Sequence, residues 1–103
     1  DVLIVRVMAE RIDAAAALKF KDALRELTGA ASHVALDLRD VQFVDSSGLG
    51  AIVAVMKLMG TTRRLDLAGL TPTVDKVFRL TRMDSIFTIH GSVDDIPKLY
   101  QAG

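Results

Sequence analysis

The sequence predicts an α/β fold with a single sheet of four to five strands, largely parallel and covered by about four helices. Segments typical of strands alternate with segments typical of helices along the chain, which favours parallel strands joined by crossover helices. The chain has 103 residues, a length that suits one domain over residues 1–103. Half of the residues are apolar, so a hydrophobic core can form without the support of disulfides or bound metal ions.

The composition excludes several classes of protein. Thirteen basic and thirteen acidic residues give a formal net charge of zero, so the sequence lacks the basic excess of a nucleic-acid binder. The absence of cysteine excludes disulfides and thiolate metal sites, and it fits a reducing, cytoplasmic compartment. No apolar run approaches the roughly 18–20 residues that a membrane span needs.

The first elements are a strand, a bend and a helix. Residues 2–8 are an apolar, β-branched run, which predicts a buried strand. Asp13 follows a bend and is placed to cap a helix over residues 14–27. Gly29 is expected to end this helix with a positive φ angle. The expected buried face of the helix comprises Ala17, Leu18, Leu24 and Leu27.

The middle of the chain predicts two extended segments and a second helix. Residues 33–38 alternate as in a strand, with Val34, Leu36 and Leu38 on one side. Residues 41–44 form a second short extended piece. The apolar stretch from residue 45 to Met59 is too long for a strand and rich in helix formers, and Gly60 ends it.

The last third predicts two further strands and two further helices. Residues 64–68 and 86–89 are expected as strands. A helix over residues 74–82 has Val74, Val77, Phe78 and Thr81 on one face. A final helix is expected within residues 92–100, and a start near Asp94 would place Pro97 harmlessly in its first turn.

Chemistry is concentrated in residues 45–50 (Asp-Ser-Ser-Gly-Leu-Gly), between a strand and a helix. The first turn of a helix has unpaired N–H groups and the positive end of the helix dipole. An anion is favoured there, and phosphoserine would bring a charge of about −1.5 to −2. The alternative is that the serine or aspartate is only a helix cap.

The helix that follows is apolar on several sides. Between Gly50 and Gly60 its only charged residue is Lys57. Such a helix is either buried all round or partly exposed for a partner. Met56 and Met59 are therefore either ordinary core residues or adaptable contacts.

Residues 41–50 (Val-Gln-Phe-Val-Asp-Ser-Ser-Gly-Leu-Gly) closely resemble the signature of STAS domains, specifically the bacterial anti-sigma factor antagonists. The similarity extends over nearly the whole chain. It includes residues 12–13 (Ile-Asp), 36–38 (Leu-Asp-Leu), 65–70 (Leu-Asp-Leu-Ala-Gly-Leu) and 74–81 (Val-Asp-Lys-Val-Phe-Arg-Leu-Thr). The pair Glu10 and Arg11 departs from the family, which often has glycine before the Leu-Asp bend, and this departure bears on the identity of the partner.

The resemblance implies a binding protein, not an enzyme, with no cofactor. Its partners would be an anti-sigma factor serine kinase, which phosphorylates Ser46, and a phosphoserine phosphatase. The unmodified protein would bind the kinase and release a sigma factor or another client. The residues expected to contact the partner are Asp13, Asp45, Ser46, Ser47, Gly48, Leu49, Gly50 and Val53. An alternative role is that of a structural STAS subunit in a transporter, lipid-transport or stress-signalling assembly.

Other residues give weaker indications. The two histidines, His33 and His90, show no metal-ligand spacing with carboxylates. A serine hydrolase using Ser46 or Ser47 would need a histidine beside it, and the segment lacks the leading glycine of a nucleophile elbow. Residues 57–82 carry six basic and two acidic residues, a pattern typical of a solvated surface or of contact with an acidic partner.

Overall fold

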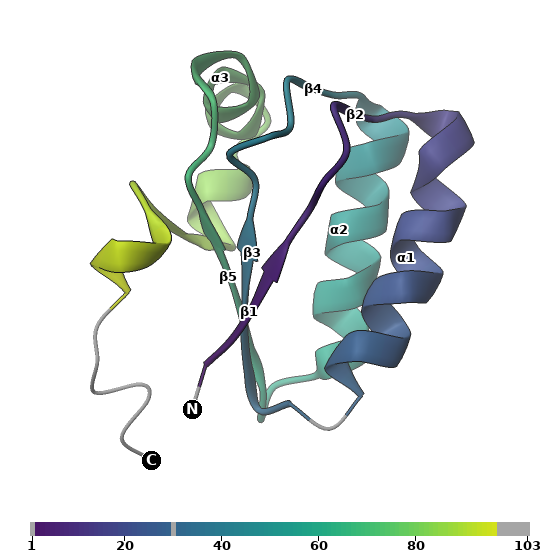
Figure 1. The fold of residues 1–103 in the computed structure, drawn as a ribbon, viewed down its shortest axis with the longest axis vertical. Helices are drawn as coiled ribbons and strands as arrows, with labels where there is room; N and C mark the ends of the chain where they lie inside the picture. Colours follow the sequence, from purple (N-terminus) through teal and green to yellow (C-terminus); the bar gives the residue numbers. More distant parts are fainter. Residues whose placement is uncertain (1, 30, 97–103) are drawn as a thin grey trace.

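The computed structural model describes residues 2–29 and 31–96, which form two parallel sheets and three α-helices (Figure 1). The main sheet has the strand order β1-β3-β5-β6, and every neighbouring pair is parallel, as predicted. A second, two-stranded parallel sheet pairs β2 with β4. The strands are β1 (Leu3–Arg6), β2 (Arg11–Ile12), β3 (His33–Asp37), β4 (Phe43–Val44), β5 (Arg64–Ala68) and β6 (Thr88–His90).

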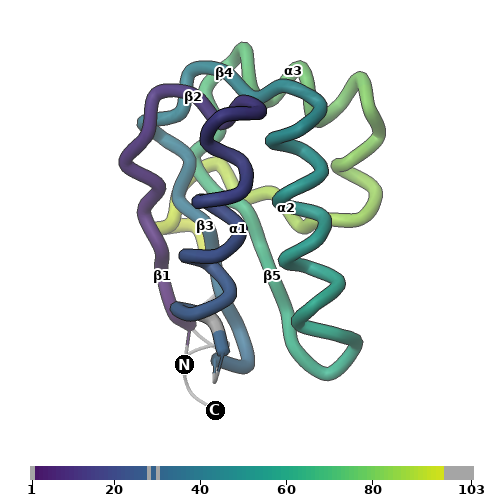
Figure 2. The backbone as a smooth tube through the Cα atoms, turned by 90° about the vertical axis from the view of Figure 1, so that its right-hand side faces the viewer, coloured from purple at the N-terminus to yellow at the C-terminus, as the bar shows by residue number. Residues whose placement is uncertain are grey.

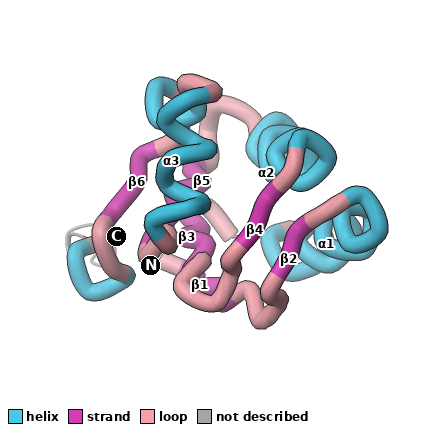
Figure 3. Tube along the Cα trace, turned by 90° about the horizontal axis from the view of Figure 1, so that it is seen from above, coloured by secondary structure: helices cyan, strands magenta, loops and turns pink. Residues whose placement is uncertain are grey.

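The two long helices, α1 (Ala14–Thr28) and α2 (Ser46–Met59), lie side by side against the main sheet (Figure 2). The third, α3 (Pro72–Leu80), lies over the end of the molecule where β2 and β4 run (Figure 3). Two 3₁₀ turns, η1 (Met83–Ser85) and η2 (Val93–Asp95), flank β6. Of the helix expected within residues 92–100, the described part contains only η2, and residues 97–100 lie outside the described residues.

Side chains of the two central strands build the core against the long helices. All five residues of β3 are buried, and Val34 and Leu36, with Leu38 just after the strand, belong to one apolar cluster, as expected for side chains on one side of a strand. Leu67 of β5 and Val55 of α2 belong to the same apolar cluster. The intervening residues of β3 and β5 point to the opposite face, which therefore receives buried polar residues such as Asp37 and Asp66.

The first strand is less buried than predicted. Leu3 and Ile4 are 38% and 42% exposed, because β1 is an edge strand that, within residues 2–29 and 31–96, pairs with β3 alone in the main sheet. An apolar run indicates a strand, but it does not distinguish the centre of a sheet from its edge. The expectation of a buried strand over residues 2–8 was therefore wrong for most of β1, although the strand itself is present.

Helix α1 buries a narrower face than predicted. Leu24 is buried and Phe20 packs against the core, whereas Leu18 and Leu27 are 64% and 59% exposed. Gly29 has a φ angle of −50°, so the expected left-handed end was also wrong. Gly60, in contrast, ends α2 with a φ angle of +73°, a conformation that favours glycine.

Candidate functional site

The site is built where two strands of the small sheet run into two helices. Ile12 of β2 lies in register with Val44 of β4, and both side chains are buried. The amide of Asp45 donates a hydrogen bond to the carbonyl oxygen of Ile12, at 3.3 Å. Each strand continues directly into a helix, so the first turns of α1 and α2 start at the same end of the molecule (Figure 3).

Two aspartates cap these helices. Asp13 has an extended backbone, and its Oδ1 accepts a hydrogen bond from the amide of Ala16 at 3.2 Å. Asp45 is also extended, and its Oδ1 accepts one from the amide of Gly48 at 2.9 Å. Side-chain caps of this kind satisfy N–H groups that the first helical turn leaves unpaired. The cap of α2 is therefore the aspartate and not a serine.

Ser46 is the first residue of α2 and is exposed. Among the residues that the structure describes, its hydroxyl group makes no hydrogen bond, and the cap of the helix is provided by Asp45. The hydroxyl thus lies at the positive end of a 14-residue helix and is open to solvent. Ser47, the next residue, is also exposed.

Gly48 has a structural role beneath this surface. It is buried, and a Cβ atom at this position would overlap the carbonyl oxygen of Ile12 and crowd the Val44 side chain. The lack of a side chain therefore lets α2 approach β2. Gly48 is among the residues predicted to contact the partner, but its burial means that it supports the surface from beneath and does not itself form exposed surface.

The remaining predicted contact residues divide between the surface and the core. Gly50 is exposed, and no atom lies within 4 Å of where its Cβ would be. Leu49 and Val53 are half-buried and pack against the core. Further along α2, Met59 is a core residue and Met56 is half-buried.

A shallow groove of about 330 Å³ runs from the helix starts between α1 and α2. Small side chains line most of it, because the two helices present alanine and glycine to each other. Lys21 and the exposed Leu18 form its outer part. The lining residues are Ala14, Ala17, Leu18, Lys21, Ser47, Gly50, Ala51 and Ala54.

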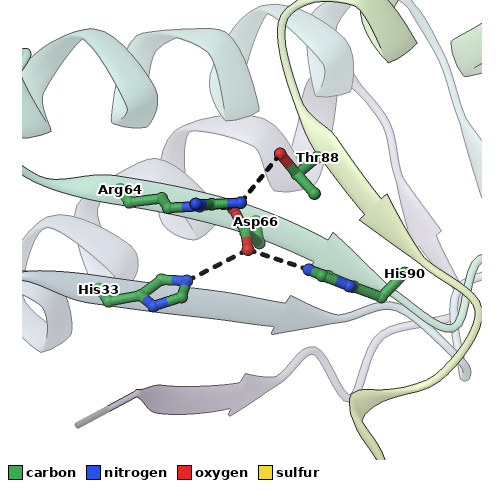
Figure 4. A network of polar contacts seen from close by, with 5 residues as sticks. All are labelled: His33, Arg64, Asp66, Thr88 and His90. Carbon is green, nitrogen blue, oxygen red and sulfur yellow. Dashed lines mark hydrogen bonds and ion pairs between the residues drawn. The ribbon is translucent and has the colours of Figure 1, made fainter. Parts of the chain in front are cut away.

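The two histidines meet at a place that sequence reasoning missed (Figure 4). The Nε2 atoms of His33 and His90 lie 3.1 and 3.0 Å from Oδ2 of the buried Asp66. The Nε atom of Arg64 lies 2.7 Å from the other oxygen, Oδ1, and also donates to it. The register of β3, β5 and β6, together with the alternation of strand side chains, places these residues on one face of the sheet. The alternation is the signal in the sequence that could have indicated this cluster.

This network is electrostatically coupled. Burial opposes ionisation of Asp66, but hydrogen bonds from Arg64, His90 and His33 outweigh it and hold the pKa of that carboxyl below its usual 3.8. In the described part of the chain, no group of three or more histidine, aspartate or glutamate side chains is arranged to hold a metal ion. Nor does either histidine hydrogen-bond to Ser46 or Ser47 among these residues, so no Ser-His pair of a hydrolase is formed.

Comparisons with known proteins agree with this geometry. The anti-sigma factor antagonist from Mycobacterium paratuberculosis is 26% identical, with a TM-score of 0.80 over 91% of this chain and 80% of that chain. The phosphorylated form of the Bacillus cell fate determinant SpoIIAA is 19% identical and shares the fold, with a TM-score of 0.66 over 99% of this chain and 91% of that chain.

A transporter shares the fold as well. A murine anion transporter of Solute Carrier family 26 is 19% identical, with a TM-score of 0.78 over 99% of this chain and only 18% of that chain. In this chain, no helix of the described residues is long and apolar enough to cross a membrane. The sequence profile of the STAS domain matches residues 1–96, and the chain therefore belongs to the STAS domain family.

Proposed function

We propose that this protein is an anti-sigma factor antagonist that binds an anti-sigma factor kinase while Ser46 is unmodified. One observation carries the proposal: Ser46 stands exposed at the start of α2 while Asp45 caps the helix, so a kinase can modify the hydroxyl without removing a structural contact. Two of the solved structures that share the fold support it, because one is an anti-sigma factor antagonist and the other a phosphorylated cell fate determinant.

Phosphorylation would change the charge of the surface and leave the fold intact. The helix N-terminus stabilises a phosphate on Ser46, so the domain itself tolerates the modification. The phosphate adds negative charge directly beside the Asp45 carboxylate, which is half-buried. A partner that docks over both groups must then desolvate two like charges. A loss of about 2.7 kcal/mol, or a hundredfold in affinity, is within reach of such a change.

The docking surface comprises the starts of α1 and α2 together. Its exposed members are Ser46, Ser47 and Gly50, and its half-buried members are Asp13, Asp45, Leu49 and Val53. Gly48 supports this surface from beneath through its fit against Ile12. In this role residues 1–103 act as one binding domain in the cytoplasm, and a phosphoserine phosphatase restores the binding form.

Phosphorylation with a candidate kinase and ATP tests the proposal. A histidine-kinase-like ATPase from the same organism would be the candidate kinase, and one encoded near the gene of this protein would be tried first. The wild-type chain and the matched control Ser47→Ala are expected to incorporate phosphate, and Ser46→Ala is not. Label that persists in Ser46→Ala and disappears in Ser47→Ala would identify Ser47 as the phosphorylated residue. Absence of label in the wild type would refute the proposal.

A structural STAS subunit is the second candidate, and the likeness to a transporter over 99% of this chain favours it. Such a subunit binds its assembly continuously and needs no modifiable hydroxyl at the helix start. The two functions differ in one measurement. If Ser46→Asp retains every partner that the wild type captures, the structural role is supported and the switch is excluded.

A further inference from the structure

We infer that Arg11, held over the ring of Phe43, selects a kinase partner that presents a carboxylate to this end of the molecule. This inference rests on the proposed function and adds the chemistry of the partner's surface. The Cζ atom of Arg11 lies 4.5 Å from the centre of the Phe43 ring, a cation–π contact. Neither residue was among those expected to contact the partner.

The register of the small sheet places Arg11 on the same outward face as the helix caps. Arg11 pairs with Phe43 and Ile12 with Val44, and the second pair is buried. Because strand side chains alternate, the first pair points away from the core. Two residues further along each strand, and therefore on the same side, are Asp13 and Asp45, whose backbones are still extended. Arg11 therefore flanks the docking surface around Ser46.

The guanidinium group of Arg11 is oriented but has unused donors. Its side chain is 59% exposed, and its nearest acidic partner is Asp13, whose Oδ2 lies 3.7 Å from Nε. Among the described residues it makes no hydrogen bond, whereas Asp13 Oδ1 is occupied by the Ala16 amide. The ring of Phe43 restricts the rotation of the side chain. A guanidinium fixed in this way loses little entropy when it binds a planar carboxylate through two parallel hydrogen bonds.

Charge complementarity identifies the occupant. Asp13 pairs with Arg11 only through its Nε, at 3.7 Å, so the outer N–H groups of the guanidinium remain available to a partner carboxylate. A partner carboxylate gains attraction from Arg11 while Ser46 is unmodified. The same carboxylate is repelled once Ser46 carries a phosphate, so one acidic contact supports both recognition and switching.

Binding of the unmodified protein to the kinase that phosphorylates Ser46 tests the inference. The variants are Arg11→Glu, Arg11→Lys and, as a control with the same change in net charge, Lys57→Glu near the far end of α2. At low salt we expect Arg11→Glu to bind at least about tenfold more weakly. Arg11→Lys should lose about two- to fivefold in affinity, because lysine keeps the positive charge but cannot form two parallel hydrogen bonds to a carboxylate. Lys57→Glu should lose less than twofold. The loss in Arg11→Glu should shrink at high salt.

Several outcomes decide against the inference while leaving the switch intact. Arg11→Glu that binds within twofold of the wild type would overturn it, and an effect confined to the phosphorylated chain would assign Arg11 to the phosphate of Ser46 instead. A loss that is equal in Arg11→Lys and independent of salt would indicate a purely structural role. If no carboxylate-to-lysine change on the contact face of the kinase restores binding to Arg11→Glu, the acidic partner is excluded. A wild-type chain that no kinase labels refutes the proposed function and this inference together.

Discussion

The carbonyl oxygen of Ile12 occupies the position that a Cβ atom on Gly48 would need. This contact links the last residue of β2 to the first turn of α2, and it sets how closely the helix approaches the small sheet. The same carbonyl accepts a hydrogen bond from the amide of Asp45. The position of Ser46 therefore depends on a strand more than thirty residues away in the sequence.

Gly48→Ala is expected to destabilise the protein by at least about 1–3 kcal/mol, because the obstacle is backbone that has no alternative rotamer. Gly50→Ala is the matched control two residues along the same helix. Its Cβ would meet no atom within 4 Å, so we expect stabilisation of about 0.5–1 kcal/mol. Urea unfolding of both variants measures the difference. Equal stability of the two would contradict the close approach of α2 to β2.

Asp45→Ala is expected to cost about 1 kcal/mol, because the variant leaves the Gly48 amide without its cap. Asp45→Asn keeps an oxygen in the same place, and its stability should lie within a few tenths of a kcal/mol of the wild type. The same pair of variants separates capping from charge. If Asn destabilises as much as Ala, the negative charge and not the hydrogen bond stabilises the helix start.

The polar network on the main sheet predicts a loss of stability in acid. The pKa of Asp66 is lower in the folded chain than its usual 3.8, so the ionised carboxylate contributes stability above that value. This contribution should fall as the pH drops below 3.8 and through the folded pKa. Urea midpoints between pH 2 and 6 measure it, with Asp66→Asn as the comparison.

Asp66→Asn should be less stable than the wild type at neutral pH and show a flatter dependence on pH. The charged hydrogen bond from Arg64 is worth about 1.5–3 kcal/mol, and the amide replaces it with a weaker one. A variant with the same acid dependence as the wild type would assign the effect to other carboxylates.

Local patterns in the sequence were sufficient for the three α-helices and for the parallel strands, but not for the conformation of Gly29 at the end of α1. The cap at Asp13 and the end of α2 at Gly60 each depend on residues adjacent in the sequence. The exposure of Leu18 and the edge position of β1 depend instead on which elements are neighbours in space. No local pattern contains that information.

The candidate site likewise combines features that the sequence predicts with features that it does not. The sequence identified Asp45 and Ser46 at a helix start, because a polar motif between a strand and a helix is a local feature. It did not reveal that Gly48 faces Ile12 or that Arg11 stacks on Phe43, because both contacts follow from the pairing of β2 with β4. Two-residue strands leave too short a pattern to predict that pairing.

Ser46→Asp separates the stability of the domain from the binding of its partner. A carboxylate at the first position of α2 interacts favourably with the helix dipole, so the variant should be as stable as the wild type or more stable by about 0.3–1 kcal/mol. The same charge lies on the docking surface beside Asp45, and we expect affinity for the kinase to fall at least about tenfold. Calorimetric unfolding and a binding titration on the same preparation measure both quantities. A decrease in both would indicate a damaged fold, and unchanged binding would refute charge gating at this hydroxyl.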